Sequence, residues 1–281
     1  MSRAGTKSSQ GDDYQIAVAI HWIIRLLSDD TIDYIQAESN GIREFSERVT
    51  VDDVVIVYKN NHRRYIQAKK NQSQNRVWSL ADLGDELIKS KEQLCSDNTG
   101  LVDFYSATPF GAFKSLADAC REYPDFMAFQ REAGQQSNAT LIDLAERWNE
   151  PPDYSYQLVQ RISFGSHLNY DEWKRQNLQE LGRLVTKPDT ALVILERFTT
   201  AHQSKQSGTN FEITKKQILV ELRKHGIVAA PNYADQEILD KFTEISRIGR
   251  DWNRTVSGQQ ISRPELTSII QNIEQRKILF S

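Results

Sequence analysis

Residues 49–70 read VTVDDVVIVYKNNHRRYIQAKK, and this stretch decides the fold. Two segments within it, Val49–Tyr58 and Arg63–Lys70, are rich in the β-branched and aromatic residues that favour strands. Between them lies Lys59-Asn60-Asn61-His62, whose asparagines tolerate turn conformations. The stretch therefore predicts a β-hairpin.

The residues on either side of the hairpin predict an α/β unit. Upstream, Tyr14–Leu27 is apolar on nearly every side and predicts a buried helix, and Asp33–Glu38 predicts another strand. Downstream, Ser79–Asp82 resembles a capping box that opens a helix to about Leu94, and Val102–Ala107 predicts a further strand. This order predicts a mixed sheet flanked by helices.

The remainder of the chain has a mainly helical pattern. One short strand is expected at Leu158–Phe164. Helical periodicity is found in the segments 111–122, 138–148, 171–185, 189–204, 212–225, 233–248 and 264–276.

Composition is that of an ordinary globular chain of 281 residues, with 39% hydrophobic and 26% charged residues. No apolar run approaches the ~20 residues that span a bilayer, and Met1–Asp13 lacks the apolar region of a secretory signal. The two cysteines, Cys95 and Cys120, fit a reducing cytoplasm. We therefore expect a cytoplasmic protein with no membrane partner. Because the net charge is −3, any contact with nucleic acid requires a local basic patch.

Polar side chains in and beside the hairpin are the candidates for chemistry. Glu38 ends a predicted strand, the doublet Asp52-Asp53 interrupts an apolar strand, and Gln67 and Lys69 lie on the returning strand. Carboxylate and amide oxygens are hard ligands of the kind that Mg²⁺ prefers, and such ions promote phosphodiester hydrolysis. Alternation places Gln67 and Lys69 on one face, where the lysine can hold the attacking water or stabilise developing charge.

The register of the hairpin stays open at this level. A two-residue turn at Asn60-Asn61 places Lys69 opposite Asp52, whereas a three-residue loop centred on Asn61 places Lys69 opposite Asp53. Opposed residues share a face, so a slip of one residue exchanges the two aspartates. A surface hairpin with a solvated charged face is the alternative interpretation, although a carboxylate inside an apolar run requires a partner or a metal.

A basic stretch surrounds the returning strand. Residues 59–81 contain six Lys or Arg and no Asp or Glu. Such a stretch can contact phosphates beside the site, with Arg63, Lys70 and Arg76 as the candidate DNA-binding residues. A solvated basic loop is the competing interpretation.

The layout of Glu, then Asp-Asp-Val, then Gln-x-Lys after a hairpin resembles the PD-(D/E)xK nuclease superfamily, in which Gln can replace the second acid of the motif. The lead-in Gly11–Gln15 (GDDYQ) before an apolar helix narrows the resemblance. It is similar to the double-stranded-DNA nuclease domain of CD-NTase-associated effectors and antiviral STAND ATPases. The resemblance covers about residues 11–107, and more loosely the helical remainder.

The resemblance implies a restriction-endonuclease-like fold and a Mg²⁺- or Mn²⁺-dependent endonuclease acting on double-stranded DNA in prokaryotic defence. It implies the catalytic residues Glu38, Asp53, Gln67 and Lys69. Of these, Glu38, Asp53 and Gln67 would hold the metal, with Asp52 as the alternative to Asp53. A catalytically inactive nuclease fold that binds nucleic acid or assembles oligomers is the alternative function, and an RNase is another.

Two further expectations follow from the resemblance alone. Gln15 could approach the active site. The spacer between Glu38 and the aspartates is longer than the family pattern, so Glu44 and Glu47 are rival acids.

The segment Ile261–Ser281 (ISRPELTSIIQNIEQRKILFS) resembles the run-in to a P-loop, although no G-x-x-x-x-G-K-[ST] motif is present in the chain. We expect a fusion to a C-terminal NTPase and a homo-oligomer when active; a plain helix and strand is the alternative. The expected organisation is a disordered lead-in at 1–10, a nuclease core at 11–110, a mainly helical extension at 111–260 and the start of an NTPase module at 261–281.

Overall fold

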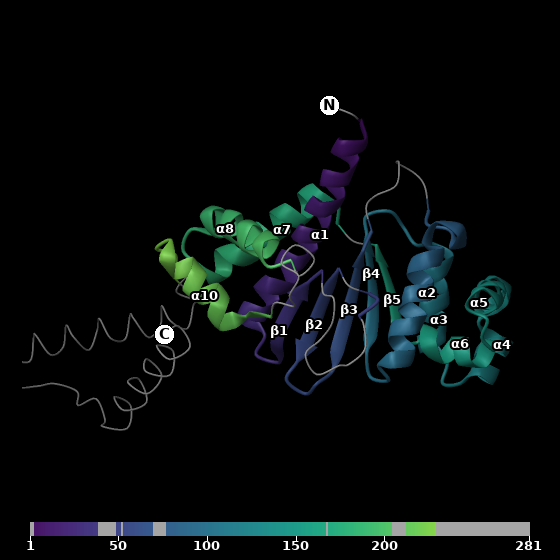
Figure 1. Cartoon of the computed structure of the whole chain (residues 1–281). Helices are drawn as coiled ribbons and strands as arrows, with labels where there is room; N and C mark the ends of the chain where they lie inside the picture. Colours follow the sequence, from purple (N-terminus) through teal and green to yellow (C-terminus); the bar gives the residue numbers. More distant parts are fainter. Residues whose placement is uncertain are drawn as a thin grey trace, which may run out of the picture.

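A six-stranded mixed sheet lies at the centre of the protein in the computed structural model (Figure 1). The strand order is β5-β4-β3-β2-β1-β6; β3, β4 and β5 are parallel neighbours and the remaining neighbours are antiparallel. The α/β class and the mixed sheet flanked by helices, both predicted from the sequence, are confirmed. The structure describes residues 3–38, 49–51, 53–69, 77–166, 168–203 and 212–228, with the backbone alone at 3–12 and 166.

The strands are β1 (Ile32–Ala37), β2 (Val54–Tyr58), β3 (Arg63–Ala68), β4 (Leu101–Ser106), β5 (Ile162–Ser166) and β6 (Ile213–Thr214). The helices are α1 (Arg3–Ser28), α2 (Leu80–Ser96), α3 (Ala112–Glu122), α4 (Phe126–Glu132), α5 (Gly134–Trp148), α6 (Pro152–Val159), α7 (Tyr170–Leu184), α8 (Pro188–Ala201) and α10 (Lys215–Lys224).

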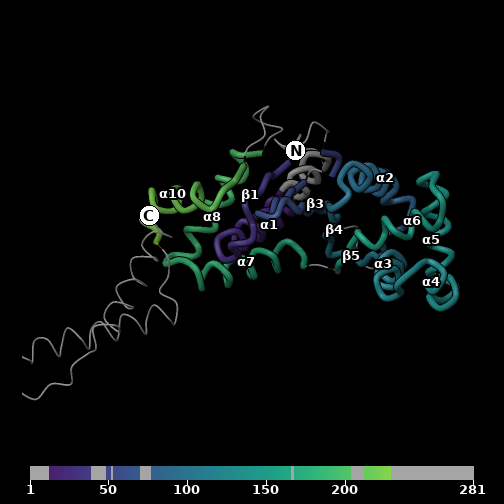
Figure 2. The backbone as a smooth tube through the Cα atoms, turned by 90° about the horizontal axis from the view of Figure 1, so that it is seen from below, coloured from purple at the N-terminus to yellow at the C-terminus, as the bar shows by residue number. Residues whose placement is uncertain are grey.

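The sheet separates two apolar cores. One core lies between one face of the sheet and the helices α1, α7, α8 and α10. The other core lies between the opposite face and the helices α2, α3, α4, α5 and α6. Figures 1 and 2 show the two helical groups on opposite sides of the strands. Because both faces are covered, β2 is apolar at consecutive positions: Val54 and Ile56 enter the first core, and Val55 and Val57 enter the second.

The hairpin has a three-residue loop, Lys59–Asn61. The loop is closed by the Tyr58 N–H, which donates to the His62 carbonyl oxygen at 3.0 Å. Asn61 has a φ of 63°, in the left-handed region that Asn tolerates better than most residues. Val54 is consequently opposite Ile66, and continuing this register places Asp53 opposite Gln67. Neither predicted register is correct, because the observed pairing, continued to the end of the hairpin, places Lys69 opposite Val51 rather than opposite Asp52 or Asp53.

The capping box predicted at Ser79 is present. Its hydroxyl accepts from the Asp82 N–H, and the Asp82 carboxylate accepts from the Ser79 N–H. Helix α2 begins directly after this cap and continues two residues past the predicted end at Leu94. Its buried face, which includes Leu83 and Leu87, lies against the second core. This packing fixes α2 above the face of the sheet that carries Val55 and Val57.

Several predicted boundaries are wrong. Helix α1 begins at Arg3, so the predicted lead-in at residues 1–10 is helical from its third residue. Once a helix has formed, each added residue gains one hydrogen bond for the ordering of one residue, so the helix can extend even through a segment that contains Ser and Gly. Leu158 and Val159 belong to α6 rather than to the predicted strand, because Pro151 and Pro152 start a helix there.

The boundary predicted at residue 110 does not separate the sheet from the rest of the chain. Strands β5 and β6, both from the segment 111–260, form the two edges of the sheet. Residues 229–281, which include two predicted helices and the proposed start of an NTPase module, lie outside the described residues. Within the described ranges, no helix combines the length and apolar character needed to cross a membrane.

Candidate functional site

The four residues predicted to be catalytic lie at one end of three neighbouring strands. Glu38 directly follows β1, Asp53 directly precedes β2, and Gln67 and Lys69 lie at the end of β3. Because β2 is antiparallel to β1 and β3, its first residue meets their last residues. The hairpin thus gathers residues that are up to 31 positions apart in the chain.

Glu38 and Asp53 are neighbours through their backbones. The Glu38 N–H donates to the Asp53 carbonyl oxygen at 3.0 Å, which continues the β1–β2 ladder by one pair. Glu38 has a φ of 49°, an uncommon conformation for a residue other than glycine. The chain therefore bends at Glu38, a half-buried residue at the same end of the sheet as Asp53.

Asp53 is a buried carboxylate with N–H donors from two elements. Its exposed fraction is 6%. Oδ1 accepts from Gln15 Nε2 of α1 at 2.9 Å, and Oδ2 accepts from the Ala68 N–H at 2.8 Å and from the Gln67 side-chain amide. These donors offset the cost of burying the charge and hold the carboxylate at the end of the sheet.

Gln67 has a buried side-chain oxygen to which no described residue donates a hydrogen bond. Its side chain is 6% exposed, and its Oε1 accepts no hydrogen bond from the residues that the structure describes. Rotation of the amide about its last torsion exchanges Oε1 and Nε2, so the oxygen can face the Asp53 carboxylate if a cation separates the two. A buried carboxylate beside a free amide oxygen is a donor set that fits a hard divalent cation.

The side chains whose printed hydrogen bonds reach the Asp53 carboxylate are the amides of Gln15 and Gln67. In the described part of the chain, no group of three or more His, Cys, Asp or Glu side chains could hold a metal ion. The ligands that the resemblance implies for a cation here are Asp53, Glu38 and the Gln67 amide oxygen. The alternative ligand Asp52 and the rival acids Glu44 and Glu47 lie outside the described residues.

Lys69 is held at both its backbone and its ammonium group. Its N–H donates to the Tyr105 carbonyl oxygen at 2.7 Å, which extends the β3–β4 pairing past the end of β3. Its Nζ donates to Glu86 Oε1 of α2, and the two side chains are 21% and 20% exposed. Alternation places Lys69 and Gln67 on the face covered by α2, as the sequence predicted.

Two of these contacts involve residues that lie outside the motif. Gln15 was expected near the site by resemblance, and its hydrogen bond to Asp53 places it there. Glu86 was not predicted. Its only sequence signal is an acid beside the apolar positions Leu83 and Leu87, and that pattern is common in helices.

The predicted DNA-binding residue Arg63 does not reach this end of the sheet. It is the first residue of β3, at the end opposite Lys69, and it is 8% exposed. Its Nη1 lies 3.7 Å from Asp97 Oδ2, so the guanidinium neutralises a buried carboxylate rather than a solvent-facing phosphate. This position and partner do not support the predicted DNA contact of Arg63. Lys70 and Arg76 lie outside the described residues.

A partly buried ion pair joins β3 to β4, and its Arg64 lies on the part of β3 that is farther from the site. Arg64 Nη1 donates to Asp103 Oδ2 at 2.6 Å, and the guanidinium also lies over the Trp22 ring of α1. Burial raises the pKa of the Asp103 carboxyl, and the Arg64 charge opposes this rise. Burial also raises the pKa of Tyr105, with a smaller contribution from the Asp103 carboxylate. These groups support the strands rather than the candidate site.

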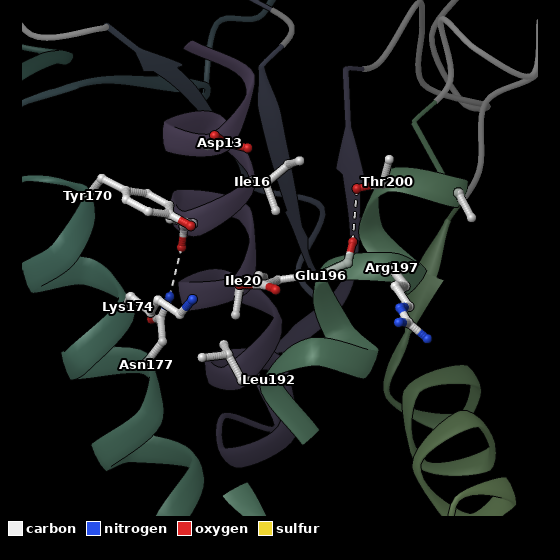
Figure 3. A pocket seen from close by; sticks show the side chains of 12 residues that line it. Asp13, Ile16, Ile20, Tyr170, Lys174, Asn177, Leu192, Glu196, Arg197 and Thr200 are labelled. Atoms are coloured by element: carbon white, nitrogen blue, oxygen red, sulfur yellow. Dashed lines mark hydrogen bonds between the residues drawn. The ribbon is translucent and has the colours of Figure 1, made fainter. Parts of the chain in front are cut away.

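A cavity of about 430 Å³ lies between α1, α7 and α8. Figure 3 shows the apolar side chains Ile16, Ile20 and Leu192 in its wall and the charged groups of Asp13 and Lys174 at its margin. It shares α1 with the candidate site, because Asp13 is two residues before Gln15. None of the four predicted catalytic residues lines it.

Comparison with known proteins identifies no family for this chain. No family model matches it, and no curated protein sequence matches it. One similar solved structure is the Acinetobacter baumannii Cap4 SAVED/CARF-domain containing receptor with the cyclic trinucleotide 3'3'3'-cAAA, at 10% sequence identity and a TM-score of 0.46. The match covers 76% of this chain and 46% of that receptor, so this chain spans less than half the receptor's length. A likeness at this level carries no argument about the fold or the function.

Proposed function

We propose that this chain is a metal-dependent endonuclease domain that cleaves double-stranded DNA, built on a restriction-endonuclease-like version of the α/β fold. The observation that carries the proposal is the convergence at Asp53. The sequence pattern selected Glu38, Asp53, Gln67 and Lys69 for a reaction, and these residues lie at the same end of three adjacent strands.

Asp53, Glu38 and Gln67 would hold a Mg²⁺ or Mn²⁺ ion through oxygen atoms. When bound, such an ion supplies Lewis-acid chemistry and lowers the pKa of a bound water. The buried position of Asp53 and the N–H donors around it keep the carboxylate oriented before any ligand arrives. This preorganisation supports catalysis because little reorganisation is required at the moment of reaction.

Lys69 would act on the phosphate rather than on the metal. An ammonium group has hydrogen-bond donors and no acceptor, so it can neutralise charge that develops on a phosphate oxygen or hold the attacking water. Lys69 lies two residues beyond Gln67 on the same face of β3, which supports a role at the same reacting group.

The biological setting is proposed from the sequence resemblance. In that proposal the domain is an effector in prokaryotic antiviral defence, fused to a C-terminal NTPase and active as a homo-oligomer. Assembly would raise the local concentration of nuclease domains on one DNA molecule, which favours paired cleavage.

A second candidate function is a catalytically inactive nuclease fold that binds nucleic acid or assembles oligomers. One observation favours it: both Asp53 oxygens already accept hydrogen bonds, so the buried carboxylate is satisfied within the protein. The two candidates differ in whether a cation changes the state of Asp53.

The deciding experiment incubates the protein with supercoiled plasmid in the presence of Mg²⁺, Mn²⁺ or EDTA. Nicked and linear products with either metal, and none with EDTA, are expected. A parallel reaction with structured RNA distinguishes a DNase from an RNase. Intact plasmid under all metal conditions, with DNA retained in a gel-shift assay, would favour the inactive binding module.

A further inference from the structure

Glu86 holds the ammonium group of Lys69, and it comes from a different element and from outside the motif. We propose that Glu86 is a positioning residue for Lys69: it fixes the lysine side chain in the orientation that the cleavage reaction uses. This inference rests on the proposed nuclease function.

The backbone of Lys69 is fixed, whereas its side chain is long. The Lys69 N–H is bonded to the Tyr105 carbonyl oxygen, so the position of its Cα is determined by β4. Beyond Cα, a lysine side chain has four rotatable bonds and roughly 2 kcal/mol of rotamer entropy. A site that depends on the ammonium position therefore requires a second point of attachment at Nζ. Among the described residues, Glu86 provides the ion pair that does this.

Glu86 lies on a helix that is firmly packed. It lies between Leu83 and Leu87, both fully buried, on the face of α2 that packs against the sheet. One turn later, the buried Ser90 hydroxyl donates to the Glu86 carbonyl oxygen at 2.7 Å. The carboxylate therefore projects from a packed helix and can serve as a fixed acceptor.

The pair of Lys69 and Glu86 is partly buried. Both side chains are about one fifth exposed, so solvent screens their attraction less than it screens that of a surface pair. The lysine is nevertheless accessible enough for a phosphate to replace or share Glu86 as its partner. A pair with this degree of exposure fits a positioning role better than a role in the core.

The chain offers a matched control. Lys91 of α2 and Glu150, which follows α5, form another ion pair at 2.5 Å, with side chains that are 21% and 25% exposed. Lys91 also donates to the Trp148 carbonyl oxygen, and this pair ties α2 to α5 rather than to the strand that carries Lys69. Substitutions at Glu150 therefore test what the loss of a similar ion pair does to α2 alone.

The experiment compares Glu86→Ala, Glu86→Gln and Glu150→Ala with the wild type in the Mg²⁺-dependent plasmid assay. Glu86→Ala is expected to lower kcat about 10- to 100-fold with KM nearly unchanged, the range found when an orienting partner is removed. Glu86→Gln keeps an acceptor oxygen but loses the charge, so a smaller loss is expected. Glu150→Ala is expected to cleave like the wild type. If Glu86→Ala does not fold, Glu86→Gln decides, and turnover equal to that of the wild type overturns the proposal.

Two further measurements separate positioning from other roles. In the double variant Lys69→Ala with Glu86→Ala, cleavage should equal that of Lys69→Ala alone, because Glu86 acts through Lys69. Acetylation of Lys69, followed by mass spectrometry, should be faster in Glu86→Ala than in the wild type or in Glu150→Ala. An additive loss in the double variant, or unchanged acetylation, would overturn the inference.

The failures of the two proposals can be told apart. If the wild type and Glu86→Ala cleave DNA equally well, the proposed role of Glu86 is overturned and the proposed nuclease function stands. A wild-type protein that does not cleave under any metal condition overturns the nuclease function and this inference with it.

Discussion

The Gln67 side-chain amide donates a hydrogen bond to the Asp53 carboxylate across the end of the β2–β3 hairpin. The same amide carries a buried oxygen that accepts no hydrogen bond from the described residues. Rotation of the Gln67 amide would turn its oxygen, instead of its NH₂ group, toward the Asp53 carboxylate, so that two oxygen atoms would face each other. Four experiments test what this arrangement and its surroundings do.

Gln67→Glu places a second carboxylate beside Asp53 and removes a donor. In EDTA we expect the thermal midpoint to fall by several degrees, because two nearby carboxylates repel and about 1 kcal/mol shifts Tm by ~2–4 °C in a domain of this size. Mg²⁺ should restore the midpoint more strongly than it raises that of the wild type, since a cation between the carboxylates cancels the repulsion. Differential scanning fluorimetry in EDTA and in Mg²⁺ measures both effects.

The control for this substitution is Gln160→Glu. The Gln160 amide donates to the Cys120 carbonyl oxygen at 2.9 Å, at the opposite end of the sheet. Its variant should lose stability without regaining it in Mg²⁺. An equal response to Mg²⁺ in both variants would show that the cation does not bind between residues 53 and 67.

Asp53→Asn should remove cleavage while leaving the protein folded. Loss of a residue that hydrogen-bonds a metal ligand lowers metal affinity or activity about 10- to 100-fold, and loss of the ligand itself should lower them further. The new NH₂ group would face N–H donors, which costs about 1–3 kcal/mol of stability. The matched variant is Asp52→Asn, whose effect on plasmid cleavage should be milder. Abolished cleavage in Asp52→Asn with intact cleavage in Asp53→Asn would show that Asp52, and not Asp53, is the metal ligand.

Lys69→Ala should abolish cleavage with little change in Tm. Loss of one preorganised group that stabilises the transition state costs on the order of 100- to 1,000-fold in rate. The side chain is half-buried beside α2 rather than in either core, so the fold should survive its removal. Lys91→Ala, which breaks the similar pair on α2, is the control for stability. Plasmid cleavage and thermal midpoints are measured side by side, and unchanged cleavage in Lys69→Ala would reject this site.

Arg64→Ala should destabilise the protein more at pH 7 than at about pH 4. Burial raises the pKa of Asp103 above its ordinary value of 3.8, and removal of Arg64 raises it further. In the folded variant Asp103 then keeps its proton to a higher pH than it does in the unfolded chain, so the stability of the variant falls as the pH rises. At pH 7 the variant must bury an unpaired carboxylate, at a cost on the order of 3 kcal/mol.

Urea denaturation at the two pH values measures this difference. The exposed pair Arg131–Glu132 supplies the control, because Arg131→Ala should have nearly the same small effect at both pH values. A loss in Arg64→Ala that does not depend on pH would mean that Asp103 is not ionised in the native protein.

The sequence by itself determined the hairpin, the apolar helix α1, the capping box of α2 and the face of the hairpin that Gln67 and Lys69 share. These features depend on neighbours in the chain. A run of β-branched residues favours extension, Ser79 and Asp82 satisfy each other's N–H groups, and alternation with a period of two assigns side chains to faces. Local rules of this kind can be read without knowing where other segments pack.

Only the tertiary structure decided the register, the partners and the edges of the sheet. The loop residues Lys59–Asn61 fit more than one turn, and packing of Val54–Val57 between two cores selects one of them, because a slip would move each side chain to the wrong face. The contacts of Asp53 with Gln15 and of Lys69 with Glu86 join residues 38 and 17 positions apart, and no local preference specifies them. Whether a polar side chain meets a carboxylate, solvent or substrate depends on the docking of whole helices, which the summed burial of their apolar faces determines.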